Sequence, residues 1–133
     1  MKLSKKEQTF VKSQGVARLA TVGRENMPHN VPVCPVMVDG KTYVASEKDA
    51  TKVKNIKAHP AATITFDVYQ DSWKGLRCVM LQCRCRIVDQ KVFKKIRTKL
   101  YAKYPKYETD AALDPADSVI IELLPQKKFS WGL

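Results

Sequence analysis

The sequence predicts an antiparallel α+β fold, mainly β, whose strands close into a barrel. Six or seven short runs of β-branched and apolar residues alternate with turns, and only three short segments have helical spacing. Most runs are joined by tight turns or short loops rather than by the helical crossovers that parallel strands need. The clearest turn is Asp39-Gly40, a strong two-residue hairpin signal. The pattern therefore favours an antiparallel barrel over a doubly wound parallel sheet.

The first half of the chain predicts one helix and three strands. Ser4 and Glu7 have the spacing of a capping box, which predicts a helix from there to about Gln14, with Gly15 as its stop. Strands are expected over residues 16–22, 31–38 and 41–46. Two prolines interrupt the second run, and proline cannot donate to a strand ladder. That strand is therefore expected to be an edge, bulged, or partly directed at a ligand.

The second half predicts two more helices and the remaining strands. One helix starts near Thr51, capped by Ser46 or Asp49, and ends before Pro60. The segment Gln90–Lys103 is the clearest helix because its apolar residues recur three or four positions apart. Further strands are expected over residues 62–69, 76–88 and 119–124, with a last short run at 129–131.

Length and composition indicate one domain, residues 1–133, of an ordinary globular protein. The chain has 133 residues, of which 44% are hydrophobic and 28% charged. No apolar run approaches the roughly 20 residues of a membrane helix, and the basic N-terminus lacks the apolar region of a signal peptide. We expect a cytoplasmic protein that does not enter a membrane.

Positive charge is unevenly distributed along the chain. The net charge is +11, and residues 84–106 contain nine Lys/Arg and only one acid. Such a segment can bind a phosphorylated ligand, an acidic partner or nucleic acid, or it can be a solvated helix surface. The solvated surface is favoured for this helix. Nucleic-acid binding, with Tyr101, Tyr104 and Tyr107 stacking on bases, is a distant alternative because Tyr104 completes the apolar face.

Sequence motifs for hydrolysis, nucleotide loops and metal binding are absent. The four cysteines form no CxxC pair, and neither histidine is spaced with them as a zinc ligand would be. Buried free thiols are favoured over a redox or metal role; the cysteines are Cys34, Cys78, Cys83 and Cys85. No side chain stands out as a general acid or base, so no catalytic residue is assigned.

Thr51 and Lys52 are the most suggestive pair for ligand binding. A hydroxyl and an ammonium group at adjacent positions near a helix N-terminus lie beside free backbone N–H groups. That combination suits a phosphate group, although exposed lysines at helix starts are common.

The order of the motifs resembles the pyridoxamine-phosphate-oxidase-like, FMN-binding split-barrel family. The resemblance spans nearly the whole chain, and the order and spacing of the motifs are more specific than any single one. The stretches that carry it are ARLATVG, PHNVPVCPVMVDGKTYVAS, TKVKNIKAHPAATITF, WKGLRCVMLQCRCRIV and IIELLPQKKFSWGL.

This resemblance implies a six-stranded antiparallel split β-barrel with short flanking helices. It implies a homodimer with an FMN in each of two grooves between the subunits. Thr51 and Lys52 would hold the phosphate, and Ala45 and Ser46 would line the ribityl and phosphate path. The residues implied against the ring or covering it are Val33, Cys34 and Pro35, then Arg77 and Cys78 from the barrel wall, and Trp131 from the end of the chain.

The chain departs from the family in two respects. Cys83 stands where the family often has glycine, and the C-terminal arginine and histidine pattern of the vitamin B6 oxidases has no clear counterpart. These departures argue against vitamin B6 oxidation, and we expect a small FMN-dependent oxidoreductase whose small-molecule redox substrate is unidentified. The alternatives are a deazaflavin (coenzyme F420)-dependent reductase of the same fold, or a protein that binds or stores FMN without turnover.

Overall fold

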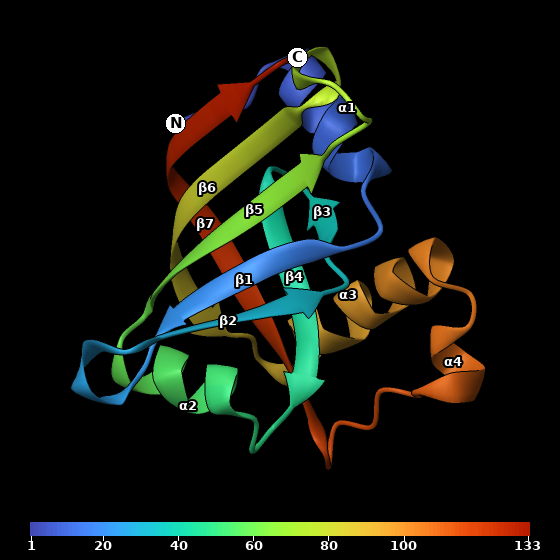
Figure 1. The fold of residues 1–133 in the computed structure, drawn as a ribbon. Helices are drawn as coiled ribbons and strands as arrows, with labels where there is room; N and C mark the ends of the chain where they lie inside the picture. Colours follow the sequence, from blue (N-terminus) through green and yellow to red (C-terminus); the bar gives the residue numbers. More distant parts are fainter.

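The computed structural model describes residues 1–133 as one curled antiparallel sheet with helices at its ends and along one side (Figure 1). The strands are β1 (Ala17–Val22), β2 (Pro28–Val33), β3 (Val36–Val38), β4 (Lys41–Glu47), β5 (Ala61–Val68), β6 (Arg77–Ile87) and β7 (Ser118–Trp131). The helices are α1 (Lys5–Ser13), α2 (Thr51–Ala58), α3 (Gln90–Lys103) and α4 (Tyr107–Asp110), with 3₁₀ turns η1 (Arg24–Asn26) and η2 (Trp73–Gly75). No helix is long and apolar enough to cross a membrane.

The sheet has the strand order β2-β1-β5-β6-β7-β4-β3, so the split of the barrel lies between β2 and β3. The predicted fold class, a mainly β antiparallel split barrel with short helices, is confirmed. The strand count differs, since the sheet has seven strands rather than six. The run predicted over residues 31–38 begins earlier, at Pro28, and breaks at Cys34-Pro35 into two strands. Both are edges, which agrees with the prediction from the prolines.

The hairpin between β3 and β4 has the predicted turn at Asp39-Gly40. Val38 pairs with Lys41, and the two turn residues have φ of 52° and 76°. Positive φ at both positions defines the turn type whose twist matches that of the flanking strands. Gly40 takes this conformation without strain because it has no Cβ.

The last strand is longer than the sequence predicted. The two runs expected at 119–124 and 129–131 form one strand, β7, of 14 residues. Pro125 lies where the pairing with β6 shifts register between Gln82 and Cys83, which leaves Gln126 as the extra residue of a bulge. A bulge tolerates a proline that a regular ladder would exclude, and so the strand continues through it.

Apolar side chains form two clusters on opposite faces of the sheet. The larger fills the barrel and includes Leu19, Ile64 and Phe66, each fully buried. The smaller lies between α3 and the outer face of β3, β4 and β7, where Phe93 and Ile96 are buried. The predicted apolar face of α3 is therefore confirmed.

Both ends of the barrel are covered by helices whose starts were predicted from local signals. At α1 the capping box is formed: Glu7 N–H donates to Ser4 Oγ at 3.1 Å, and Ser4 N–H donates to Glu7 Oε1 at 2.7 Å. At α2 the predicted caps are wrong. The N-cap is Ala50, which has no capping side chain. The Ser46 hydroxyl donates to the Glu47 carbonyl instead.

Candidate functional site

The start of α2 is a helix N-terminus without a capping side chain. The N–H groups of Thr51 and Lys52 donate to no acceptor of the protein, while those of Val53 and Lys54 both reach the Ala50 carbonyl. Thr51 is exposed and Lys52 is partly buried, and Lys52 has no carboxylate within ion-pair distance. The first turn of α2 therefore carries two free N–H groups, a hydroxyl and an unpaired ammonium group, a combination that suits a phosphate.

Helix α2 is fixed by contacts on the side that faces the barrel. Val53 and Ile56 are buried in the barrel cluster, and Asn55 Nδ2 donates to the buried Thr21 hydroxyl at 3.0 Å. A helix fixed through its opposite face can present its first turn without moving. The predicted phosphate anchor, Thr51 and Lys52, thus lies on a rigid element.

The break between β2 and β3 contains the residues predicted to face the flavin ring. Val33 belongs to the barrel cluster, so its side chain points into the core, whereas Cys34 is only partly buried. The Pro35 carbonyl accepts hydrogen bonds from Tyr104 Oη at 2.6 Å and Lys103 Nζ at 2.8 Å. Burial lowers the pKa of Lys103. The C-terminal end of α3 therefore fixes this break.

Ala45 and Ser46 point to opposite faces of β4. Ala45 packs against the cluster beneath α3. Ser46 lies on the same face of β4 as Val44, whose side chain is in the barrel core. Side chains of successive strand residues alternate between faces. Both residues nevertheless line one hollow of about 350 Å³ at the end of β4, beside α4 and the start of β7.

Arg77, Cys78 and Trp131 come together at the other end of the barrel. Cys78 and Trp131 are paired across β6 and β7, and Trp131 is 53% exposed. Gly132, at φ +75°, lies against the Leu76 carbonyl, where a Cβ would collide. The end of the chain is thereby held over the start of β6. Arg77 points to the face opposite Cys78 and stacks on Phe10 of α1 at 5.4 Å.

The pair at the start of α2, Thr51 and Lys52, does not meet the group at the start of β6 within one chain. The N–H of Cys85, near the end of β6, donates to the carbonyl of Pro60, which lies just after α2. Arg77 is at the other end of the same strand. A rise of about 3.3 Å per residue separates Arg77 from Cys85 by about 26 Å. Figure 1 shows the same separation, with α1 at one end of the barrel and α2 at the other. One protomer therefore contains two separate parts of the predicted site.

The cysteines are all free, and two lie in the core. Burial raises the pKa of Cys83 and of Cys85 to about 12, so neither thiol is ionised at neutral pH. No group of three or more potential ligand side chains could hold a metal ion. Burial is confirmed for Cys83 and Cys85, whereas Cys34 and Cys78 are free but only partly buried.

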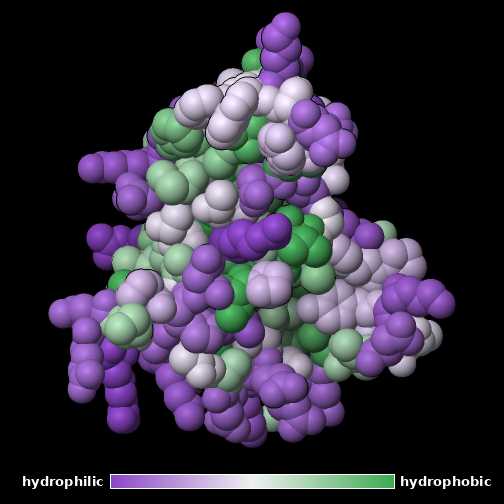
Figure 2. Space-filling model, viewed as in Figure 1, coloured by the Kyte–Doolittle hydropathy of each residue, from purple (hydrophilic) through white to green (hydrophobic).

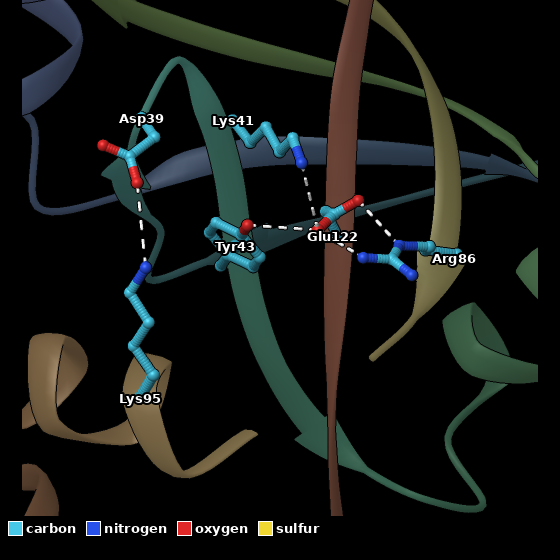
Figure 3. A network of polar contacts seen from close by, with 6 residues as sticks. All are labelled: Asp39, Lys41, Tyr43, Arg86, Lys95 and Glu122. Atoms are coloured by element: carbon cyan, nitrogen blue, oxygen red, sulfur yellow. Dashed lines mark hydrogen bonds and ion pairs between the residues drawn. The ribbon is translucent and has the colours of Figure 1, made fainter. Parts of the chain in front are cut away.

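A charged network that the sequence did not reveal joins β4, β6 and β7 (Figure 3). The buried Glu122 carboxylate accepts from Arg86 Nε at 2.8 Å, Arg86 Nη2 at 3.1 Å and Tyr43 Oη at 3.0 Å, with Lys41 Nζ 3.8 Å away. The Arg86 hydrogen bonds lower the Glu122 pKa, while burial and then the carboxylate raise the Tyr43 pKa to about 12. Every donor is committed to Glu122, which indicates a structural role.

Sequence comparison places the whole chain in one group of proteins. Residues 3–132 match the family described as pyridoxamine 5'-phosphate oxidase. A shorter match joins the chain to the 5a,11a-dehydrotetracycline/5a,11a-dehydrooxytetracycline reductase of Streptomyces rimosus subsp. rimosus, with 54% identity over 33 residues. That match covers 25% of this chain and 23% of the reductase.

Solved structures with the same fold are described with different ligands or cofactors. The heme storage protein HutZ from Vibrio cholerae matches with a TM-score of 0.81 and 15% identity, over 97% of this chain and 94% of that one. An F420 reductase matches at 0.77 and 21%, over 96% and 98%. A FAD-binding protein from Mesorhizobium loti matches at 0.74 and 20%, over 96% and 93%. At these identities the likeness shows the fold alone.

Proposed function

Because the chain belongs to the pyridoxamine 5'-phosphate oxidase family, we propose that it is a redox protein that binds FMN and transfers electrons to a small molecule. The family resemblance expected from the order of the sequence motifs is confirmed by this match. The cofactor, the activity and the ten site residues remain proposals for this chain.

The start of α2 is the observation that carries the proposal. The free N–H groups of Thr51 and Lys52, the Thr51 hydroxyl and the Lys52 ammonium fit the terminal phosphate of a mononucleotide. Glu47 and Asp49 are exposed just before the helix. They leave the N–H groups free, because the N-cap position itself is Ala50.

The other half of the site would come from a second copy of the chain. The outer face of β6 and β7 carries Met80 paired with Phe129, and Cys78 paired with Trp131. Phe129 is 49% exposed, an apolar surface that pairing of two copies would cover. Beside it lies a groove of about 410 Å³ lined largely by small residues of β1 and β5. In this proposal a homodimer formed here would bring Trp131 toward the anchor of the other chain.

In this proposal the protein binds and orients the cofactor, and bound flavin supplies the hydride or electron transfer. Thr51 and Lys52 hold the phosphate. The break at Cys34-Pro35, fixed by Tyr104 and Lys103, sets the ring-facing edge. No side chain of the site is placed as a proton donor or acceptor, and so the substrate stays unassigned.

A deazaflavin cofactor, coenzyme F420, is the second candidate. It carries a longer, acidic tail, and the net charge of +11 favours it. Figure 2 shows hydrophilic side chains over most of the periphery of one face, with hydrophobic atoms in smaller patches between them. The third candidate is a protein that holds FMN without turnover. It differs from an enzyme in that its bound flavin does not react with electron donors and acceptors.

The visible spectrum of the purified protein, with mass identification of bound cofactor, tests the proposal. We expect a flavin spectrum and FMN. A colourless protein that takes up coenzyme F420 but not FMN would replace the first candidate by the second, and uptake of neither would refute both.

The anchor is tested by Lys52→Ala, which should weaken FMN binding about 10- to 100-fold, as expected for one charge-assisted phosphate contact. Lys57→Ala is the matched control, because Lys57 is exposed in the last turn of the same helix. Equal loss in both variants would show that the general charge of α2 matters, and the phosphate would then not be held at its start. Analytical ultracentrifugation tests the proposed dimer, and a monomer at micromolar concentration would contradict it.

A further inference from the structure

Two partly buried lysines of the chain have no acidic partner. The partly buried lysines are Lys41, Lys52 and Lys103, whereas the other lysines are exposed. The ammonium group of Lys41 lies 3.8 Å from the Glu122 carboxylate. Lys52 and Lys103 form no ion pair. A cation that has lost part of its water and has no counter-ion favours an anionic ligand.

The Lys103 ammonium group is fixed at the break between β2 and β3. Its Nζ donates to the Pro35 carbonyl at 2.8 Å and lies 5.4 Å from the centroid of the Tyr104 ring. Tyr104 Oη donates to the same carbonyl at 2.6 Å. An ammonium group has three N–H donors, and the protein uses one of them. Two donors and one positive charge therefore remain for a ligand.

The break at Cys34-Pro35 is the edge that the proposed function assigns to the flavin ring. Val36, the first residue after the break, pairs with Tyr43 of β4. The strand continues from Tyr43 to Glu47 and then leads to the anchor at the start of α2. A rise of about 3.3 Å per residue makes the distance from Tyr43 to Glu47 about 13 Å. A mononucleotide held at the anchor and extended along β4 would therefore have its ring on the side where Lys103 lies.

The two unpaired lysines match the two negative groups of a reduced flavin mononucleotide. The phosphate is negative in both redox states, and the proposed function assigns it to Lys52. The ring is neutral when oxidised. A hydride taken from an organic donor brings two electrons and one proton, so the ring gains one negative charge. An ammonium group beside the ring stabilises this charge and has little effect on the neutral ring. Burial lowers the pKa of Lys103, which indicates that the ammonium group lacks the stabilisation that an anion would supply.

We propose that Lys103 stabilises the negative charge that the flavin ring gains on reduction, and that it thereby raises the reduction potential of the bound cofactor. This role rests on the proposed function, since it takes FMN to be bound with its ring at Cys34-Pro35. Lys103 then favours the reduced over the oxidised ring, whereas Lys52 binds both states alike. A raised potential makes the flavin easier to reduce and limits its electron acceptors to compounds whose own potential is higher still.

The reduction potential of the FMN-loaded protein tests the proposal. The protein is titrated with dithionite beside a reference dye, and absorbance gives the ratio of reduced to oxidised flavin at each potential. Lys103→Gln keeps a donor for the Pro35 carbonyl and removes the charge. At a fixed potential the ratio should fall about tenfold, which equals a potential about 30 mV lower for two electrons. Lys103→Arg keeps the charge, and its ratio should stay close to that of the parent protein.

Two comparisons separate this effect from net charge and from cofactor binding. Lys99→Gln removes an exposed charge one turn earlier on α3 and should leave the ratio unchanged; a fall equal to that in Lys103→Gln would refute the proposal. Oxidised FMN should bind Lys103→Gln as tightly as it binds the parent protein, because the oxidised ring is neutral. An equal loss of affinity for oxidised and reduced FMN would also refute the proposal. Should Lys103→Gln fail to fold, Lys103→Met, which keeps the stem of the side chain, replaces it.

FMN binding itself separates this role of Lys103 from the proposed function. Bound FMN with the same reduction potential in the parent protein and in Lys103→Gln overturns the role of Lys103 and leaves the cofactor assignment intact. A parent protein that takes up no FMN overturns that assignment, and the role of Lys103 falls with it.

Discussion

Replacing Glu7 by glutamine removes the charge that ties α1 to the last strand. Burial alone would raise the pKa of Glu7, but hydrogen bonds from Lys128 and from the Ser4 N–H outweigh it, and the pKa is about 2 against an ordinary 4.5. At 1.36 kcal/mol per unit, the carboxylate contributes at most about 3.4 kcal/mol at neutral pH. Lys128 is 35% exposed, and solvent screening lowers our expectation to about 2–3 kcal/mol.

The sign of the pH dependence follows from the lowered pKa. The contribution is fully present above about pH 4.5, where the unfolded chain is also ionised, and it is lost as the pH falls through 2. For these two pKa values, about 1.4 kcal/mol remains at pH 3. The glutamine variant lacks this dependence, so its deficit relative to the parent protein should shrink by about half between pH 7 and pH 3.

Urea unfolding at pH 7 and pH 3, followed by circular dichroism, measures the deficit. With a slope of about 2 kcal/mol per molar, the midpoint of Glu7→Gln should fall by about 1–1.5 M at pH 7. Glu108→Gln is the matched control, since Glu108 is exposed on α4 and makes no hydrogen bond or ion pair through its side chain. A deficit below about 0.5 kcal/mol, or one unchanged at pH 3, would refute the reasoning.

Two further predictions concern buried groups. Glu122→Gln should destabilise the protein by about 2 kcal/mol in the same unfolding assay, because Arg86 and Tyr43 lose a charged acceptor; because the Glu122 pKa is lowered, that loss should shrink as the pH falls through the acid range. Cys83 and Cys85 should resist a thiol reagent at pH 8 in the folded protein and react only after unfolding, because burial raises both pKa values to about 12; rapid labelling of either one in the native state would contradict this.

Features set by neighbouring residues could be predicted from the sequence. The capping box of Ser4 and Glu7, the turn at Asp39-Gly40 and the bounds of α3 all depend on groups within about one helical turn of each other. The order of such features also sufficed for the fold class. The start of α2 at Thr51 could be predicted because it too is local, although its N-cap could not.

Features set by distant contacts could not be predicted. Glu122 reaches Arg86, which is 36 residues away, and Tyr104 bonds Pro35 across 69 residues. The strand predicted over residues 119–124 continues through Pro125, and this could not be predicted because the bulge that accommodates the proline depends on the register with β6. The short helix α4 has too few residues to show a period.

The edge strand β2 has a consequence for how the protein behaves in a crowded solution. Pro28 and Pro32 have no N–H, yet both lie opposite residues of β1 in the ladder. Positions 28, 30 and 32 must therefore direct their backbone N–H away from β1. Of the three outward positions, only Asn30 has a donor to offer. An approaching strand from another molecule would find almost no ladder to extend. The prolines that break the β pattern in the sequence thus protect the open side of the barrel from edge-to-edge aggregation.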